Sequence, residues 1–123
     1  MDSIDPIGFA REWEAAWNRR DVEAVLQHFH EDAVFTSPLA QKIGVAADGV
    51  LKGKSAIRSY WQTALAKSQG SETHFQVTRV YRGVDTVVMS FVIASEDQKV
   101  DRAEVLRFKD GLVIEGHGTV EMD

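Results

Sequence analysis

Two histidines and two carboxylates lie close together between a helical segment and an apolar segment: His28, His30, Glu31 and Asp32. Imidazole and carboxylate groups are common metal ligands, so a metal site is the first interpretation to test. Histidines at i and i+2 do not share a face of a helix, whereas a helical metal pair needs the spacing i, i+4. We therefore expect no metal here. The pattern favours a polar helix end and a turn at Glu31–Asp32, with His30 kept as a candidate for a pocket edge.

A second acid–base candidate is Glu104, which interrupts an apolar segment. Strand alternation places Glu104, Leu106 and Phe108 on one face. If that face is buried, the pKa of the carboxyl rises, which suits acid–base catalysis or hydrogen bonding to a ligand. The alternative is that Glu104 faces solvent and pairs with Arg79 or Arg102, which contributes little stability.

A third candidate is His117, which stands between Gly116 and Gly118. The two glycines share the opposite face of the strand and leave room there for a ligand or for aromatic rings of the helices. A shift of the register by one residue would instead bring His117 beside Glu104 as an acid–base pair.

The composition narrows the class of function. The chain has 123 residues, with 14 Lys and Arg against 19 Asp and Glu, and its net charge of −5 is spread without long blocks. Nucleic acid and anionic membranes are therefore not expected as partners. The absence of cysteine excludes thiolate chemistry and Cys-based zinc sites. No apolar run approaches the ~18 residues of a spanning helix, and the acidic start is unlike a secretory leader, so we expect a cytoplasmic protein.

Helical spacing predicts three amphipathic helices. The first begins at Asp5–Pro6 and ends near Asn18–Arg20, the second is capped by Asp21, and the third begins at Ser55 and ends before Gly70. Their predicted inward side chains are Phe9, Trp13, Ala16 and Trp17, then Val22, Val25, Leu26 and Phe29, then Ile57, Tyr60, Trp61, Ala64 and Leu65.

The remaining segments alternate or run apolar, which is typical of strands. Helices that come first and strands that follow indicate an α+β domain, and we expect residues 1–123 to form one domain. For residues 86–95 the sequence does not decide whether Met89, Phe91 and Ile93 or the intervening residues face inward. Strands are predicted at 33–37, 74–82, 86–95, 102–108 and 112–122, with residues 39–53 as a loop that contains a small hairpin through Val50–Leu51.

The order of these motifs resembles the NTF2-like superfamily, within it the SnoaL-like and ketosteroid-isomerase-like branch. The resemblance implies a cystatin-like α+β cone, in which three N-terminal helices pack on a curved, mostly antiparallel sheet. That fold serves isomerases, cyclases, hydrolases and non-catalytic proteins, so it does not by itself give a function. The matching segments are WNRRD from Trp17, FHEDAVFTSP from Phe29, LKGKSAIRSYW from Leu51 and RFKDGLVIEGHG from Arg107.

The resemblance also assigns positions to three catalytic groups of ketosteroid isomerases. The base falls on Ser37, the tyrosine on Trp13 and the protonated acid on Glu104. A serine hydroxyl does not abstract a carbon-bound proton without a strong base beside it, and an indole cannot share a proton as a phenol does. Steroid isomerisation by that mechanism is therefore not expected. The same mapping places Gly116 and Gly118 on the face toward the cone and His117 on the outer face of the sheet, where such proteins often dimerise.

Two functions remain open. One is an enzyme, an isomerase, cyclase, lyase or hydrolase for a small apolar molecule, with Glu104 as its acid–base group and Tyr60 as the best candidate for a second hydroxyl in the cavity. The other is a non-catalytic ligand-binding or dimeric assembly module, with a solvated or ion-paired Glu104 and a cone filled by aromatic rings. No cofactor motif is present. The predicted ligand-binding residues are Trp13, Trp17, Phe35, Ser37, Tyr60, Met89, Phe91, Gly116 and His117.

Overall fold

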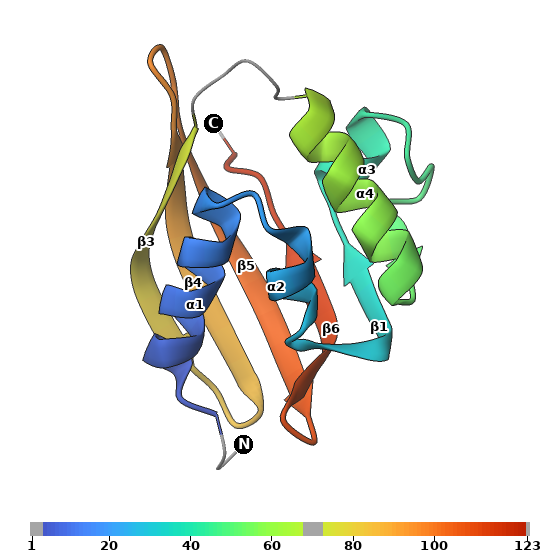
Figure 1. Ribbon diagram of the computed structural model, residues 1–123, viewed down its shortest axis with the longest axis vertical. Helices are drawn as coiled ribbons and strands as arrows, with labels where there is room; N and C mark the ends of the chain where they lie inside the picture. Colours follow the sequence, from blue (N-terminus) through green and yellow to red (C-terminus); the bar gives the residue numbers. More distant parts are fainter. Residues whose placement is uncertain (1–3, 68–72, 123) are drawn as a thin grey trace.

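The computed structural model describes residues 4–67 and 73–122 as a helical layer on one sheet (Figure 1). The predicted α+β architecture is confirmed. In chain order the elements of the described residues are α1 (Pro6–Asn18), α2 (Val22–Leu26), β1 (Phe29–Thr36), α3 (Pro38–Lys42), β2 (Val50–Lys52), α4 (Lys54–Lys67), β3 (His74–Arg82), β4 (Thr86–Ala94), β5 (Lys99–Lys109) and β6 (Leu112–Gly118).

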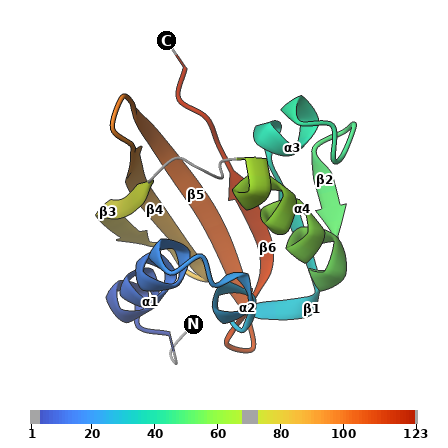
Figure 2. The ribbon, with the colours of Figure 1, turned by 45° about the horizontal axis from the view of Figure 1, so that its top comes forward.

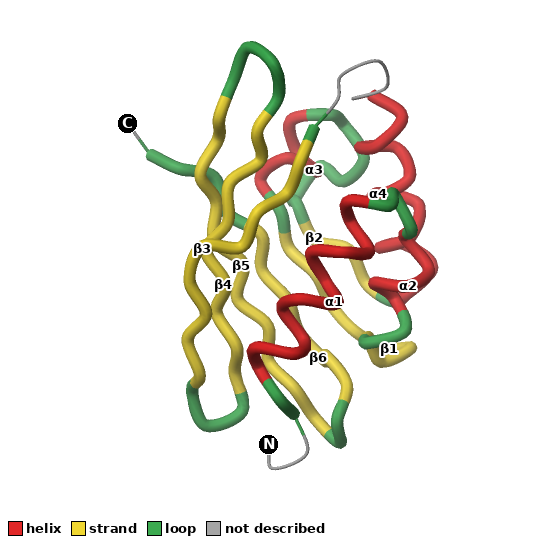
Figure 3. Tube along the Cα trace, turned by 60° about the vertical axis from the view of Figure 1, so that its left-hand side comes forward, coloured by secondary structure: helices red, strands yellow, loops and turns green. Residues whose placement is uncertain are grey.

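The sheet has the strand order β2-β1-β6-β5-β4-β3. Neighbouring strands are antiparallel except for β1 and β6, which are parallel. The helices lie on one face of the sheet, and the strands curve around this helical layer (Figures 2 and 3). Among the residues that the structure describes, no helix lies on the other face.

Helix α1 is fastened to the edge strand β3 by polar side chains. The Asn18 amide donates to the carbonyl of Phe75 at 3.0 Å and accepts from its N–H at 2.8 Å. Glu14 accepts from the N–H of Val77 at 2.6 Å, beside a bulge of β3. Asp21 caps α2, as predicted. The Asn and Asp of the segment WNRRD therefore join α1 to the sheet and begin the next helix.

Strand β1 begins earlier than predicted, and the expected turn at Glu31–Asp32 is wrong. The N–H of Val113 donates to the carbonyl of His28 at 2.7 Å, and Phe29 is already paired with Val113. A register shift between Phe29 and Val34 forms a bulge, and the polar residues His30, Glu31 and Asp32 therefore belong to the strand.

The segment 39–53 also differs in part from its prediction as a loop. It contains the short helix α3, whose N-cap Ser37 accepts from the N–H of Leu39 at 3.2 Å. Strand β2 pairs with β1. Helix α4 begins one residue before Ser55, and Gly70, its predicted limit, lies outside the described residues.

The core fills the space between the helices and the sheet. On β4 the inward set is Val87, Met89 and Phe91, which settles the alternation that the sequence left open. On β5 it is Glu104, Leu106 and Phe108, which share one face as predicted, and this face is the buried one of the two alternatives that the sequence left open. Within the described residues no helix is long and apolar enough to cross a membrane.

Candidate functional site

A cavity of about 200 Å³ lies between α1, α4 and the sheet. Its wall is mostly aromatic and includes all three tryptophans of the chain, Trp13, Trp17 and Trp61. The rings of Trp17 and Trp61 meet edge to face with centroids 5.1 Å apart. The predicted residues Phe35 and Phe91 line the same wall. The aromatic rings therefore form the wall of the cavity and do not fill it.

Glu104 projects from β5 into this cavity and is 9% exposed. Its Oε2 is a buried oxygen with no hydrogen-bond partner among the described residues. Burial raises the pKa of the Glu104 carboxyl to about 8, while a hydrogen bond from the Trp13 side chain and the charge of Arg102 act in the opposite direction. The carboxyl is therefore largely protonated at neutral pH and can donate a hydrogen bond to a ligand.

Ser37 and Tyr60 form a second polar group in the cavity wall. The two hydroxyl oxygens are 2.8 Å apart and both residues are buried. Burial raises the pKa of the Tyr60 phenol, and the hydrogen bond with Ser37 lowers it by less. The Tyr60 hydroxyl is thus held in its neutral form and oriented by the residue that also caps α3.

Arg102 also lines the cavity, although it is not among the predicted site residues. The sequence favours Arg102 only as an outward partner for Glu104, yet the two residues are two positions apart on one strand and share a face. Neither side chain forms an ion pair within the described residues. The strict alternation of β5 was the pattern that could have identified Arg102.

Three predicted ligand-binding residues lie outside the cavity lining. Met89 is fully buried in the core. Gly116 faces inward, but a Cβ there would lie 2.8 Å from Cδ1 of Phe35, so this ring already occupies the space beside the glycine. His117 faces the outer side of the sheet, where its ring is hydrogen-bonded to Thr36 at 2.6 Å. Gly118 does line the cavity.

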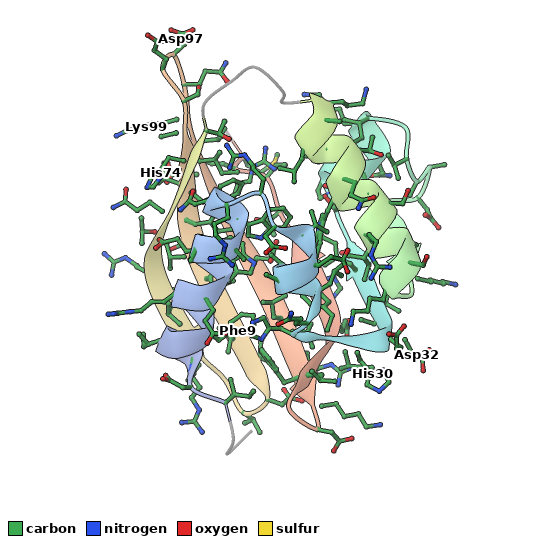
Figure 4. All side chains as sticks on the ribbon, viewed as in Figure 1. Phe9, His30, Asp32, His74, Asp97 and Lys99 are labelled. Atoms are coloured by element: carbon green, nitrogen blue, oxygen red, sulfur yellow. The ribbon has the colours of Figure 1, made fainter. Side chains whose placement is uncertain are left out.

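The polar group at the start of β1 lies away from this cavity. Nε2 of His28 is 3.2 Å from a carboxylate oxygen of Glu12, and its ring meets the edge of Phe9. His30 and Asp32 point outward at the lower end of the molecule (Figure 4). In the part of the chain that the structure describes, no three His, Asp or Glu side chains are placed to hold a metal ion.

The curved sheet, the helical layer and the aromatic cavity between them define an NTF2-like α+β fold. The chain belongs to the SnoaL-like domain family, whose model matches residues 10–116. The predicted family resemblance is confirmed. No protein with a curated description is a significant match.

Solved structures support the same fold. A SnoaL-like protein of unknown function from Burkholderia thailandensis is 28% identical, with 95% of each chain covered and a TM-score of 0.81. A hypothetical protein of ketosteroid-isomerase-like fold from Catenulispora acidiphila, in complex with trimethylamine, is 18% identical, with 93% of this chain and 85% of that chain covered and a TM-score of 0.68. TerC, co-crystallised with polyporic acid, is 15% identical, with 94% of this chain and 91% of that chain covered and a TM-score of 0.74.

Proposed function

We propose that the chain binds a small apolar carbonyl compound in the aromatic cavity and catalyses acid–base chemistry on it with Glu104. The reaction class is isomerisation, cyclisation, elimination or hydrolysis. The observation that carries the proposal is the buried Oε2 of Glu104, which has no hydrogen-bond partner among the described residues and belongs to a side chain of the cavity wall. Leaving such an atom unpaired costs about 1–3 kcal/mol, and a ligand that pairs with it recovers this energy.

The chemistry follows from the protonation state of the carboxyl. At neutral pH Glu104 is largely protonated, so it can donate to a carbonyl oxygen and transfer its proton as that oxygen becomes negative. As the pH approaches 8, a growing fraction is ionised and can accept a proton. The size of the cavity agrees with a one-ring ligand, because an apolar cavity of about 150 Å³ already holds benzene.

Two of the similar structures were determined with small molecules, one in complex with trimethylamine and the other co-crystallised with polyporic acid. This supports a small molecule as the occupant of the present cavity as well. Their low identity supports the fold alone, so the carbonyl class proposed for this chain rests on Glu104 and not on their ligands.

The second candidate function is ligand binding without catalysis. Among the described residues of the lining, Glu104 is the single carboxyl, and the Tyr60 hydroxyl is already engaged with Ser37. A reaction that needs separate acid and base groups would have to use Glu104 for both steps. This observation favours the binding module as the alternative.

We also propose that the outer face of the sheet pairs two copies of the chain. Five side chains form one row across that face through the strand register: Tyr81, Val88, Val105, His117 and Thr36. The apolar members of this row, Tyr81, Val88 and Val105, would be removed from water if a second copy covered the face.

The polar groups beside this row are already paired within the subunit. Glu115 accepts from Arg107 at 2.9 Å and lies 2.8 Å from Nε2 of His117, and the His117 and Arg107 contacts lower the pKa of the Glu115 carboxyl. Covering this part of the face therefore leaves the Glu115, Arg107 and His117 side chains paired. A face that carries both charges can pair with itself about a two-fold axis.

The test of the cavity uses acetophenone and its isosteric alkene, α-methylstyrene, with fluorescence of the three cavity tryptophans as the readout. Wild type should bind the ketone roughly fivefold more tightly, as expected for one hydrogen bond of about 1 kcal/mol. Glu104→Gln keeps a donor and should keep this preference, whereas Glu104→Leu should lose it.

Catalysis is tested by exchange of the methyl hydrogens of acetophenone in D₂O, followed by NMR. Exchange above the buffer rate in wild type that is lost in Glu104→Gln supports the enzyme. Selective binding without exchange supports the binding module. Equal or absent binding of the two probes would overturn both functions.

A further inference from the structure

Arg102 and Glu104 lie one after the other along β5 in the cavity wall. Residues two apart on a strand project from the same face and are roughly 6–7 Å apart along it. Side-chain burial decreases in this direction, from fully buried Leu106 through Glu104 at 9% exposure to half-buried Arg102. Glu104 therefore lies deeper in the cavity wall, and Arg102 lies nearer to solvent.

The guanidinium of Arg102 has no carboxylate within ion-pair distance among the described residues. Its positive charge nevertheless acts inside the cavity, because it lowers the pKa of both the Glu104 carboxyl and the Tyr60 phenol. An arginine whose donors have no carboxylate partner among the described residues, beside an apolar cavity, is suited to a planar anion, which it can bind through two parallel hydrogen bonds.

We propose that the cavity selects a carbonyl compound of about one ring that also carries an anionic group, with Arg102 binding the anion and Glu104 donating to the carbonyl oxygen. This inference rests on the proposed function of the same cavity and adds the charge of the substrate. The substrate class is an aromatic or alicyclic keto acid, or an ester or amide that bears a carboxylate.

The charges of such a complex are balanced. The cationic guanidinium meets one anion, and the neutral carboxyl of Glu104 meets a neutral carbonyl. A neutral ligand would bring no counter-charge for Arg102. A cationic group at the same position would be repelled by the guanidinium. The spacing of the two side chains also places one ring between the anion and the carbonyl.

Three probes that differ only in the para substituent of acetophenone test the inference: 4-acetylbenzoate, 4-acetylbenzamide and 4-acetyl-N,N,N-trimethylanilinium. Wild type should bind the anion at least about tenfold more tightly than the amide, because a charge-assisted bidentate contact is added, and should bind the cation most weakly. Tryptophan fluorescence reports all three titrations.

Variants locate the effect. Arg102→Gln should weaken binding of the anion to about the level of the amide, and it should weaken binding of the amide by a smaller factor, because the uncharged amide has no charge-assisted contact to lose. Arg102→Lys keeps the positive charge but lacks the planar pair of donors of a guanidinium, so it should restore part of the preference for the anion. Arg82→Gln, at the exposed end of β3, is the matched control and should bind as wild type does.

The inference is overturned if wild type binds the anion and the amide alike, or if the preference for the anion survives in Arg102→Gln. Comparison of the wild-type affinities needs no variant, so a folding defect cannot hide the result. If acetophenone itself binds through Glu104 but no anion preference exists, the inference alone fails. If none of the ketones binds, the proposed function fails with it.

Discussion

At the scale of the residue, Glu104 and Arg102 show which side-chain orientations strand alternation can predict. Alternation identified the face of Glu104 in advance, because its neighbours Leu106 and Phe108 are apolar and need a core. The same rule places Arg102 on the face of Glu104, but an arginine near a carboxylate also suggests an ion pair at the surface, and this interpretation is wrong here because the two side chains form no ion pair. Alternation could not show that Gly116 is covered by Phe35, because contacts between strands far apart in sequence depend on the register of β1 and β6.

The first prediction concerns the pH dependence of stability. Between the ordinary pKa of 4.5 and about 8, the unfolded chain loses the Glu104 proton while the folded chain keeps it. Stability should therefore fall as the pH rises through this interval, by up to about 1.4 kcal/mol per pH unit for this group. Glu104→Gln cannot ionise, so its free energy of unfolding relative to wild type should increase from pH 5 to pH 8 and then level off.

Urea unfolding of both proteins at unit steps from pH 5 to pH 9 measures this difference. Glu96→Gln, which changes an exposed carboxyl, is the control and should follow the wild-type curve. Parallel curves for wild type and Glu104→Gln would show that the carboxyl is solvated in the folded protein.

At the scale of the element, the long segments were predictable and the short ones were not. Helix α1 has an apolar stripe of helical period along its whole length, so its bounds follow from local sequence. Helix α3 has only five residues and depends on its cap, Ser37, and on contacts with the rest of the fold. The early start of β1 depends on pairing with β6. Because this pairing is bulged, the first residues of the strand are polar and do not show the alternation by which a strand is predicted.

Strand β6 offers a matched pair of substitutions that separate packing from binding. A Cβ at Gly116 would meet Phe35 at 2.8 Å and Leu106 at 3.0 Å, so Gly116→Ala should cost about 1–3 kcal/mol of stability. A Cβ at Gly118 would meet Phe35 at 3.5 Å, an ordinary contact, so Gly118→Ala should change stability by less than about 0.5 kcal/mol. Its methyl group would nevertheless enter the cavity wall.

We therefore expect Gly118→Ala to weaken acetophenone binding while its urea midpoint stays near that of wild type. Gly116→Ala should show the lower midpoint. Equal midpoints for the two variants would mean that Phe35 is free to move, and unchanged binding by Gly118→Ala would place the ligand elsewhere.

At the scale of the whole molecule, the helices cover one face of the sheet and leave the other bare. The inner face encloses the cavity, and the outer face carries the row that includes Val88 and Val105. Both valines are only half-buried in the single subunit. A curved sheet with one uncovered, partly apolar face is more stable when that face is also covered, and a second copy offers an identical face that carries charges of both signs.

If the outer faces pair, Val105 lies close to the centre of the interface, and Val105→Lys would place a charge where the partner excludes water. The variant should sediment as a monomer while wild type sediments as a dimer, and its circular dichroism should match wild type because the residue faces away from the core. Gln98→Lys adds the same charge at the exposed turn between β4 and β5 and should remain dimeric. A monomeric wild type, or a Val105→Lys variant that still sediments as a dimer, would exclude pairing through this face. The cavity lies on the opposite side of the sheet, so Val105→Lys should still bind acetophenone.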